Sequence, residues 1–120
     1  GLSGKWDTAA EYLSVFPNVL LGTHRDHAYA ILLLPDGVDS TEERVHIYYA
    51  GETDADLRIR NTEQWKEVFE EDIFVVEGMQ RGRAAPGFDG GRFSPAMDGP
   101  THAFHKWVAQ RMGADPQTAQ

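Results

Sequence analysis

One long segment with helical periodicity constrains this chain more than any other feature. From Asn61 to Arg83 the sequence reads NTEQWKEVFEEDIFVVEGMQRGR, with apolar residues at the i, i+3, i+4, i+7 spacing of a helix that buries one face. Asp72 falls on that face, three residues after Phe69 and four before Val76. A buried carboxylate is unfavourable unless a cation, a metal or several donors meet it. The predicted face comprises Trp65, Val68, Phe69, Ile73, Val76 and Met79.

Two interpretations of Asp72 follow from this predicted burial. The chain contains five histidines, so a carboxylate facing the core is a candidate metal ligand. Alternatively, Asp72 forms a buried ion pair with an arginine such as Arg81 or Arg83. From the residues alone the two interpretations are equally good.

Composition limits the class of protein. The chain has 120 residues, enough for one small domain, and 41% of them are hydrophobic, which excludes a disordered segment. The formal net charge of -8 argues against nucleic acid or an anionic membrane as the main partner. No apolar run reaches the roughly 18 to 20 residues of a membrane span, and no secretory signal is recognisable. Because the chain has no cysteine, disulfides and thiolate metal sites are excluded. We expect a soluble cytoplasmic protein.

Upstream of the long helix the sequence predicts an antiparallel sheet. Two short apolar runs after Glu11 are separated at Pro17, which favours a bend or strand edge. A clear strand is expected from about residue 26 to 34. Another strand, over about residues 44–50, alternates apolar and polar side chains after the Pro35-Asp36-Gly37 turn. The long helix follows, with Asn61 or Thr62 as its cap.

The C-terminal part predicts a second helix over residues 101–112. Asp98 or Thr101 is expected to cap it, after an irregular glycine- and proline-rich stretch. The whole chain is then an α+β fold of three or four antiparallel strands with helices packed on one face of the sheet. Six side chains are expected to be buried or to face inward in this part: Phe88, Phe93, Phe104, Trp107, Val108 and Met112.

Histidine pairs offer two alternative metal sites. His24 and His27 with Asp72 would form the two-histidine, one-carboxylate set that suits non-haem Fe(II). However, a strand turn should splay the two rings, so a solvated hairpin tip is the better interpretation. His102 and His105 have helical i, i+3 spacing, and Asp98 could join them. An ordinary polar first turn nevertheless explains these residues more simply.

Two motifs connect the chain to a known family. The stretch from about Tyr12 to Met112 resembles the C-terminal part of the catalytic domain of Rieske-type aromatic ring-hydroxylating oxygenase α subunits. The more specific motif is E-D-x-x-x-x-E-x-x-Q-x-G, and the weaker one is F-P-N. The residues that carry them are Glu71, Asp72, Glu77, Gln80 and Gly82 for the first, and Phe16, Pro17 and Asn18 for the second.

The resemblance implies a fold and a set of site residues. The expected fold is a partial helix-grip (Bet v 1/START-like) fold, with residues 1–10 as a lead-in, 11–112 as the catalytic-domain portion and 113–120 as a C-terminal tail. By the family pattern, Asp72 is the carboxylate ligand of the mononuclear iron. Phe16 and Asn18 are possible residues of the substrate pocket. The family's two iron-ligand histidines lie upstream of the matching segment, and His24 and His27 do not match them.

The resemblance also implies a parent function. A full-length α subunit would use non-haem Fe(II) and O2 to hydroxylate or demethylate an aromatic or small organic substrate, with electrons from a [2Fe-2S] Rieske cluster. We expect this chain alone to be inactive and to bind neither cofactor. Its expected partners are the missing N-terminal half of the α subunit and further copies of itself. The alternative is a non-catalytic helix-grip domain that binds a ligand or self-associates.

Overall fold

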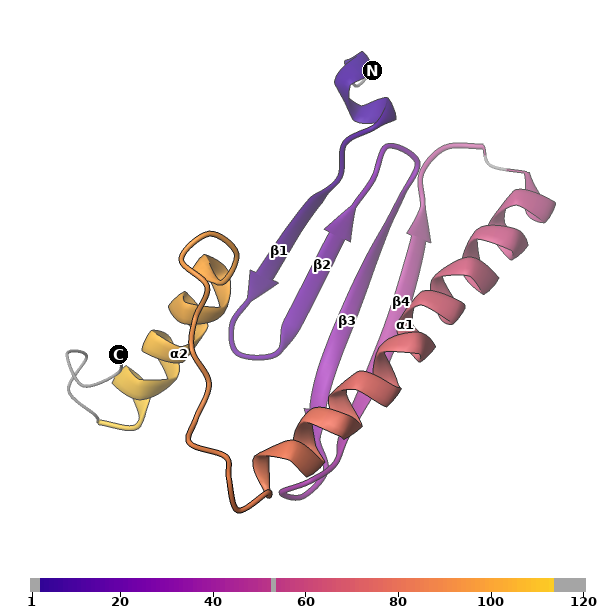
Figure 1. Ribbon diagram of the computed structural model, residues 1–120. Coiled ribbons are helices and arrows are strands. Elements are labelled where there is room, and N and C mark those ends of the chain that lie inside the picture. Colours follow the sequence, from indigo (N-terminus) through magenta and orange to yellow (C-terminus); the bar gives the residue numbers. More distant parts are fainter. Residues whose placement is uncertain (1–2, 53, 114–120) are drawn as a thin grey trace. The chain divides into compact units, whose positions relative to one another are not determined.

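The computed structural model describes residues 3–52 and 54–113 and divides the chain into two compact units, Gly1–Phe88 and Asp89–Gln120. The first unit contains a four-stranded antiparallel sheet in the order β1-β2-β3-β4, with helix α1 lying along it (Figure 1). This arrangement confirms the α+β prediction and forms a partial helix-grip fold. Its elements are a short 3-10 turn η1 (Gly4–Asp7), β1 (Glu11–Val15), β2 (Val19–Thr23), β3 (His27–Pro35), β4 (Thr41–Tyr49) and α1 (Ala55–Arg83).

The turn between β1 and β2 lies at Pro17, where the sequence predicted a break between two apolar runs. The Phe16–Pro17 peptide bond is cis, and β2 resumes at Val19. The Asn18 side-chain amide donates to the Leu33 carbonyl at 3.0 Å, and the Leu33 backbone N–H donates to the Asn18 carbonyl at 2.9 Å. These two bonds tie the turn to β3, so it is a fixed corner of the sheet.

The small core lies on the side of the sheet that faces α1. Successive residues of a strand point to opposite faces, and on β3 this places His27, Tyr29 and Ile31 on the buried side. Tyr29 pairs with Gly22 on β2 and with Ile47 on β4. The Tyr29 ring lies over Gly22, where an added Cβ would overlap it. Gly22 therefore provides the space that the core tyrosine fills.

Helix α1 begins six residues earlier than predicted. Asp54 is its N-cap residue, and the Asp54 side chain accepts a hydrogen bond from the Asp56 backbone N–H at 3.3 Å. The expected caps, Asn61 and Thr62, lie inside the helix. The prediction was wrong because residues 55–60 (ADLRIR) contain no helix breaker and follow a good capping residue.

The apolar face predicted for α1 is only partly buried. Trp65 and Phe69 are half-buried, but the remaining members of the face are exposed. Among the described residues of this unit, no layer of side chains covers the second half of the helix, so the prediction of one continuous buried face is wrong. The exposed fractions are 36% for Val68, 50% for Ile73, 56% for Val76 and 62% for Met79.

The second unit is built around helix α2 (Gly99–Arg111), as the sequence predicted. Asp98 occupies the N-cap position, but its carboxylate accepts from the Ser94 backbone N–H at 2.7 Å instead of capping the helix. Phe93 and Met112 are 37% and 80% exposed, and Phe88 of the first unit is 49% exposed. The expectation that these three side chains are buried is therefore wrong. Most of the predicted tail, residues 114–120, lies outside the described residues.

Over residues 3–52 and 54–113, neither helix is long and apolar enough to cross a membrane.

Candidate functional site

Asp72 lies on an exposed side of α1 rather than in a core. Helical spacing places it with Val68, Val75 and Met79, which are also exposed, and we call these four residues the Asp72 flank. On the face of the sheet that carries the core, Tyr12 of β1 is 63% exposed. The expected burial of Asp72 is wrong because none of the described parts of this unit forms a layer over this side of the helix. An exposed carboxylate is solvated and needs no cation to stabilise it.

The residues around Asp72 do not fit an iron centre with two histidine ligands and one carboxylate. In the described ranges, no three histidine, aspartate or glutamate side chains are grouped so that they could hold a metal ion. His24 and His27 therefore do not assemble a site with Asp72. Among the residues that the structure describes, Asp72 is not part of such a group.

The His24 and His27 pair has a structural arrangement that the sequence analysis missed. Their rings stack in parallel, with centroids 4.4 Å apart and planes inclined by 3°. His27 is only 9% exposed. The expected solvated hairpin tip with splayed rings is wrong, because His27 opens β3 on the same face as Tyr29 and Ile31. The period-2 alternation of the strand, extended by one step toward its N terminus, would have indicated this burial.

His27 joins the sheet to α1 through a hydrogen-bond chain. The Trp65 indole Nε1–H donates to His27 Nε2 at 2.8 Å, and His27 Nδ1 lies 2.7 Å from Asp26 Oδ1. The hydrogen bond from His27 lowers the pKa of the Asp26 carboxyl below its ordinary value. We call Asp26, His27 and Trp65 the His27 anchor. Four further rings pack on it: His24, Tyr29, Tyr49 and Phe69.

Phe16 and Asn18, the possible pocket residues, lie at the turn between β1 and β2. Neither residue lines either of the two clefts described below. The Asn18 side chain is occupied by its hydrogen bond to the Leu33 carbonyl. Its contacts indicate a structural role in fixing this corner, and its assignment to a substrate pocket stays a prediction.

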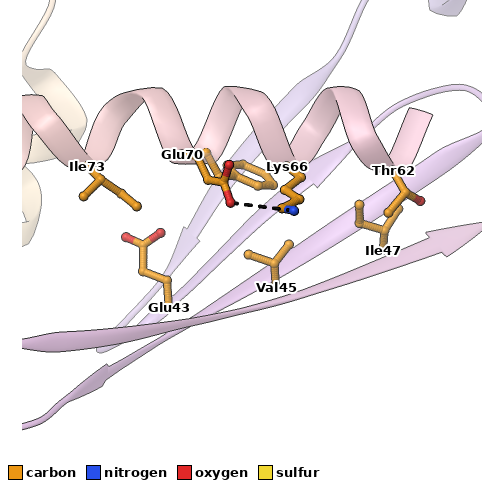
Figure 2. A pocket seen from close by; sticks show the side chains of 8 residues that line it. Glu43, Val45, Ile47, Thr62, Lys66, Glu70 and Ile73 are labelled. Carbon is orange, nitrogen blue, oxygen red and sulfur yellow. Dashed lines mark ion pairs between the residues drawn. The ribbon is translucent and has the colours of Figure 1, made fainter. Parts of the chain in front are cut away.

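A cleft of about 520 Å³ separates β4 from α1 (Figure 2). Its apolar lining comes from both elements, and Lys66 and Glu70 of the helix form a weak ion pair across 4.0 Å. Glu43 of β4 points toward the helix in Figure 2. The cleft thus combines an apolar wall with a few charged groups, which is the usual character of a small-molecule site. Its lining residues are Glu43, Val45, Ile47, Thr62, Lys66, Phe69, Glu70 and Ile73.

A second cleft, of about 990 Å³, lies between the β3–β4 loop and the end of α1. Two residues of the family motif, Glu77 and Gln80, line it. Glu77 also approaches Arg81 at 3.8 Å, an exposed i, i+4 pair of little energetic weight. The motif residues therefore divide between two sides of the helix, with Asp72 on one and Glu77 and Gln80 on the other.

The second unit does not assemble the alternative metal site. Phe93 packs against His102 and His105, with ring centroids at 4.8 and 5.1 Å. Asp98 accepts from the Ser94 backbone, as described above. The two histidines serve as packing partners for Phe93.

Comparison with known families identifies one match, to the model described as "Ring hydroxylating alpha subunit (catalytic domain)", over residues 2–114. Searches of the curated proteins and of the solved structures give no significant match. The match covers nearly the whole chain, including the E-D-x-x-x-x-E-x-x-Q-x-G motif on α1 and the F-P-N turn of the sheet. On this ground the chain belongs to the ring-hydroxylating α subunit family and represents sequence from its catalytic domain.

Proposed function

We propose that this chain is the C-terminal part of an oxygenase α subunit catalytic domain and that Asp72 is its carboxylate ligand to a mononuclear non-haem iron. The observation that carries the proposal is the family match across residues 2–114, which includes the motif that contains Asp72. The exposure of Asp72 supports it, because a ligand that completes a site with residues from other sequence must be open to them. Histidine and carboxylate ligands with open positions suit non-haem Fe(II).

The proposed parent reaction is hydroxylation or demethylation of an aromatic or small organic substrate with O2. A Rieske [2Fe-2S] cluster needs two cysteine and two histidine ligands, and this chain has no cysteine. The cluster and the two iron-ligand histidines are therefore assigned to an N-terminal part of the α subunit. We expect this chain alone to be inactive.

The proposed contact with that N-terminal part uses the open side of the first unit. The Asp72 flank carries three exposed apolar side chains, and all five residues of β1 are exposed along an edge strand. Exposed edge strands and apolar patches favour association with further chain. The same surfaces account for the expected association between copies of this chain when the N-terminal part is absent.

Iron content tests the proposal. In a full α subunit, Asp72→Ala should lose the mononuclear iron while the visible absorption of the Rieske cluster is retained. Glu67→Ala is the matched control, since Glu67 is an exposed carboxylate of α1 outside the family motif and its loss should leave both metal contents unchanged. Full retention of the mononuclear iron in Asp72→Ala would contradict the assignment. Stoichiometric iron in the isolated chain, lost in Asp72→Ala, would contradict its predicted inactivity.

A non-catalytic ligand-binding domain is the second candidate function. The observation that favours it is the cleft between β4 and α1, which is large enough for a small organic molecule. Binding of an apolar fluorescent probe to the isolated chain, weakened by Phe69→Ala and unaffected by Phe74→Ala, would support this function. Absence of binding at high protein concentration would exclude it.

A further inference from the structure

The His27 anchor fixes the protonation state of a buried histidine. Trp65 Nε1–H can only donate a hydrogen bond, so His27 Nε2, at 2.8 Å, must accept with its lone pair. The proton of neutral His27 is then on Nδ1 and is donated to Asp26 Oδ1 at 2.7 Å. The contact between strand and helix therefore requires the neutral Nδ1–H tautomer of His27.

A second proton on His27 is incompatible with this contact. Protonated Nε2 would carry a hydrogen that points at the indole N–H, and neither group could accept from the other. His27 is 9% exposed, so its ring has little access to water without movement of Trp65. His27 can take up the second proton only when the hydrogen bond to α1 is given up.

The His24 ring, which stacks on His27, makes a second proton at this site still less favourable. His24 Nε2 is buried and has no hydrogen-bond partner among the described residues. Burial and the neighbouring His27 lower the pKa of His24 from 6.5, whereas Asp26 opposes this effect. Two protonated rings with centroids 4.4 Å apart would repel each other.

The other elements around the anchor contribute little that would stabilise a positive charge on His27 or His24. β1 contributes Tyr12 against His24, β3 contributes Tyr29, and β4 contributes Tyr49 against His27. From α1, the Arg58 guanidinium lies over the Tyr49 ring and is itself positive. Asp26 is the nearby carboxylate, but its side chain is 59% exposed and its attraction is screened by solvent. In the same turn, the Arg25 cation pairs with Asp7.

We propose that Asp26, His27 and Trp65 form a proton-sensitive anchor that holds the first half of α1 on the sheet at neutral pH and releases it in mildly acidic solution. The anchor works in the chain irrespective of whether Asp72 binds iron, so it does not rest on the proposed function. Its two states differ by one proton on His27 and by the hydrogen bond that joins β3 to α1.

The direction of the pH dependence follows from the hydrogen bond between Trp65 and His27, because a second proton on His27 removes the lone pair that accepts from the indole. His24 contributes in the same direction. Because its pKa is lowered in the folded chain, the unfolded chain binds more protons between that lowered value and 6.5. The contribution to stability is then fully present above 6.5 and is lost as the pH falls through this window. Release of the anchor acts in the same direction.

Nuclear magnetic resonance of the 15N-labelled full chain tests the anchor. The Trp65 indole N–H, assigned with Trp65→Phe, should be protected from exchange at about pH 8, and histidine ring nitrogens should report the Nδ1–H tautomer of His27. Protection of Trp65, corrected for the intrinsic pH dependence of exchange, should fall at least about tenfold by about pH 5, the factor that corresponds to one ordinary hydrogen bond. The indoles of Trp6 and Trp107 serve as internal references and should not show this loss of protection.

Substitution separates the anchor from simple packing. His27→Gln can accept from Trp65 and donate to Asp26 but does not titrate, so it should keep Trp65 protected down to about pH 5. His46→Gln is the matched control, because His46 is exposed on β4 and its loss should leave the wild-type response intact. An Nε2–H tautomer of His27 in the wild-type chain, or unchanged Trp65 protection between the two pH values, would overturn the proposal even if His27→Gln fails to fold.

Discussion

The two halves of α1 lie in different surroundings. Residues 55–69 contact the sheet through Trp65 and Phe69 and through hydrogen bonds to the Tyr49 hydroxyl. In residues 70–83 the side chains of Ile73, Val76 and Met79 are all at least half exposed. Both halves carry apolar residues at helical spacing. The difference lies in the sheet: β3 and β4 present rings to the first half, whereas only the second half of the helix lines the larger cleft. The smaller cleft is lined by both halves.

This comparison separates two roles of an apolar residue on a helix. In the first half, apolar and aromatic side chains stabilise the packing of this unit. In the second half, exposed apolar side chains surround the motif that carries the family match, and a surface of this kind favours contact with other protein. Substitutions in the first half should therefore change stability, and those in the second half should not.

Truncation of Trp65 should have the largest effect. Trp65→Ala removes the hydrogen bond to His27 and the ring contacts with Tyr29 and Phe69. We expect the free energy of unfolding to fall by about 3 kcal/mol. Urea denaturation followed by circular dichroism measures the change. Phe74→Ala, at a 77% exposed position of the second half, should stay within about 0.5 kcal/mol, and equal losses in both variants would remove the distinction between the halves.

A methyl group at Gly22 should have the next largest effect. Gly22→Ala places a Cβ against the Tyr29 ring that packs on Trp65, so one of the two rings must shift. Overpacking of this kind costs about 1 to 3 kcal/mol. Gly82→Ala is the control in the second half, because an added Cβ there meets nothing within 4 Å. Thermal denaturation should show Gly82→Ala unchanged or up to about 1 kcal/mol more stable.

Loss of the Tyr49 hydroxyl should have a smaller effect. This group bonds the Asn61 side chain and the Thr62 hydroxyl at 2.9 Å each, and the Arg58 carbonyl at 3.0 Å. Tyr49→Phe should reduce the free energy of unfolding by about 1 kcal/mol. Tyr48→Phe, on the opposite face of β4, tests whether the loss is specific. If Tyr49→Phe leaves the free energy of unfolding unchanged in urea denaturation, the hydroxyl does not help to hold the first half of α1 on the sheet.

Removal of the Asp72 carboxylate should have the smallest effect on stability. Because Asp72 is exposed, Asp72→Ala should change the free energy of unfolding by less than about 0.5 kcal/mol. Guanidinium denaturation of the isolated chain provides the measurement. A loss above about 1 kcal/mol would show that Asp72 has a stabilising partner in the fold. It would contradict the expectation that only the first half of α1 contributes to stability.

Much of the fold was predictable because local patterns determine it. Alternation at Val45, Ile47 and Tyr49 identified β4, and Pro17 marked the break between β1 and β2. The start of α1 was missed because the strongest apolar periodicity begins after the helix does. The His27 anchor was missed because it joins residues 38 positions apart, and no local spacing reports such a contact.

The sequence by itself determined the element types, the α+β class and the family, since periodicity, turn residues and the motif around Asp72 are local properties of the chain. The tertiary structure alone decided which apolar residues are buried. It placed His27 in the core and Asp72 outside it, the reverse of the predicted solvated hairpin tip and the predicted buried carboxylate. The physical reason is that burial depends on what lies opposite a side chain. β3 lies opposite Trp65, and within this unit no described layer of side chains covers the Asp72 flank.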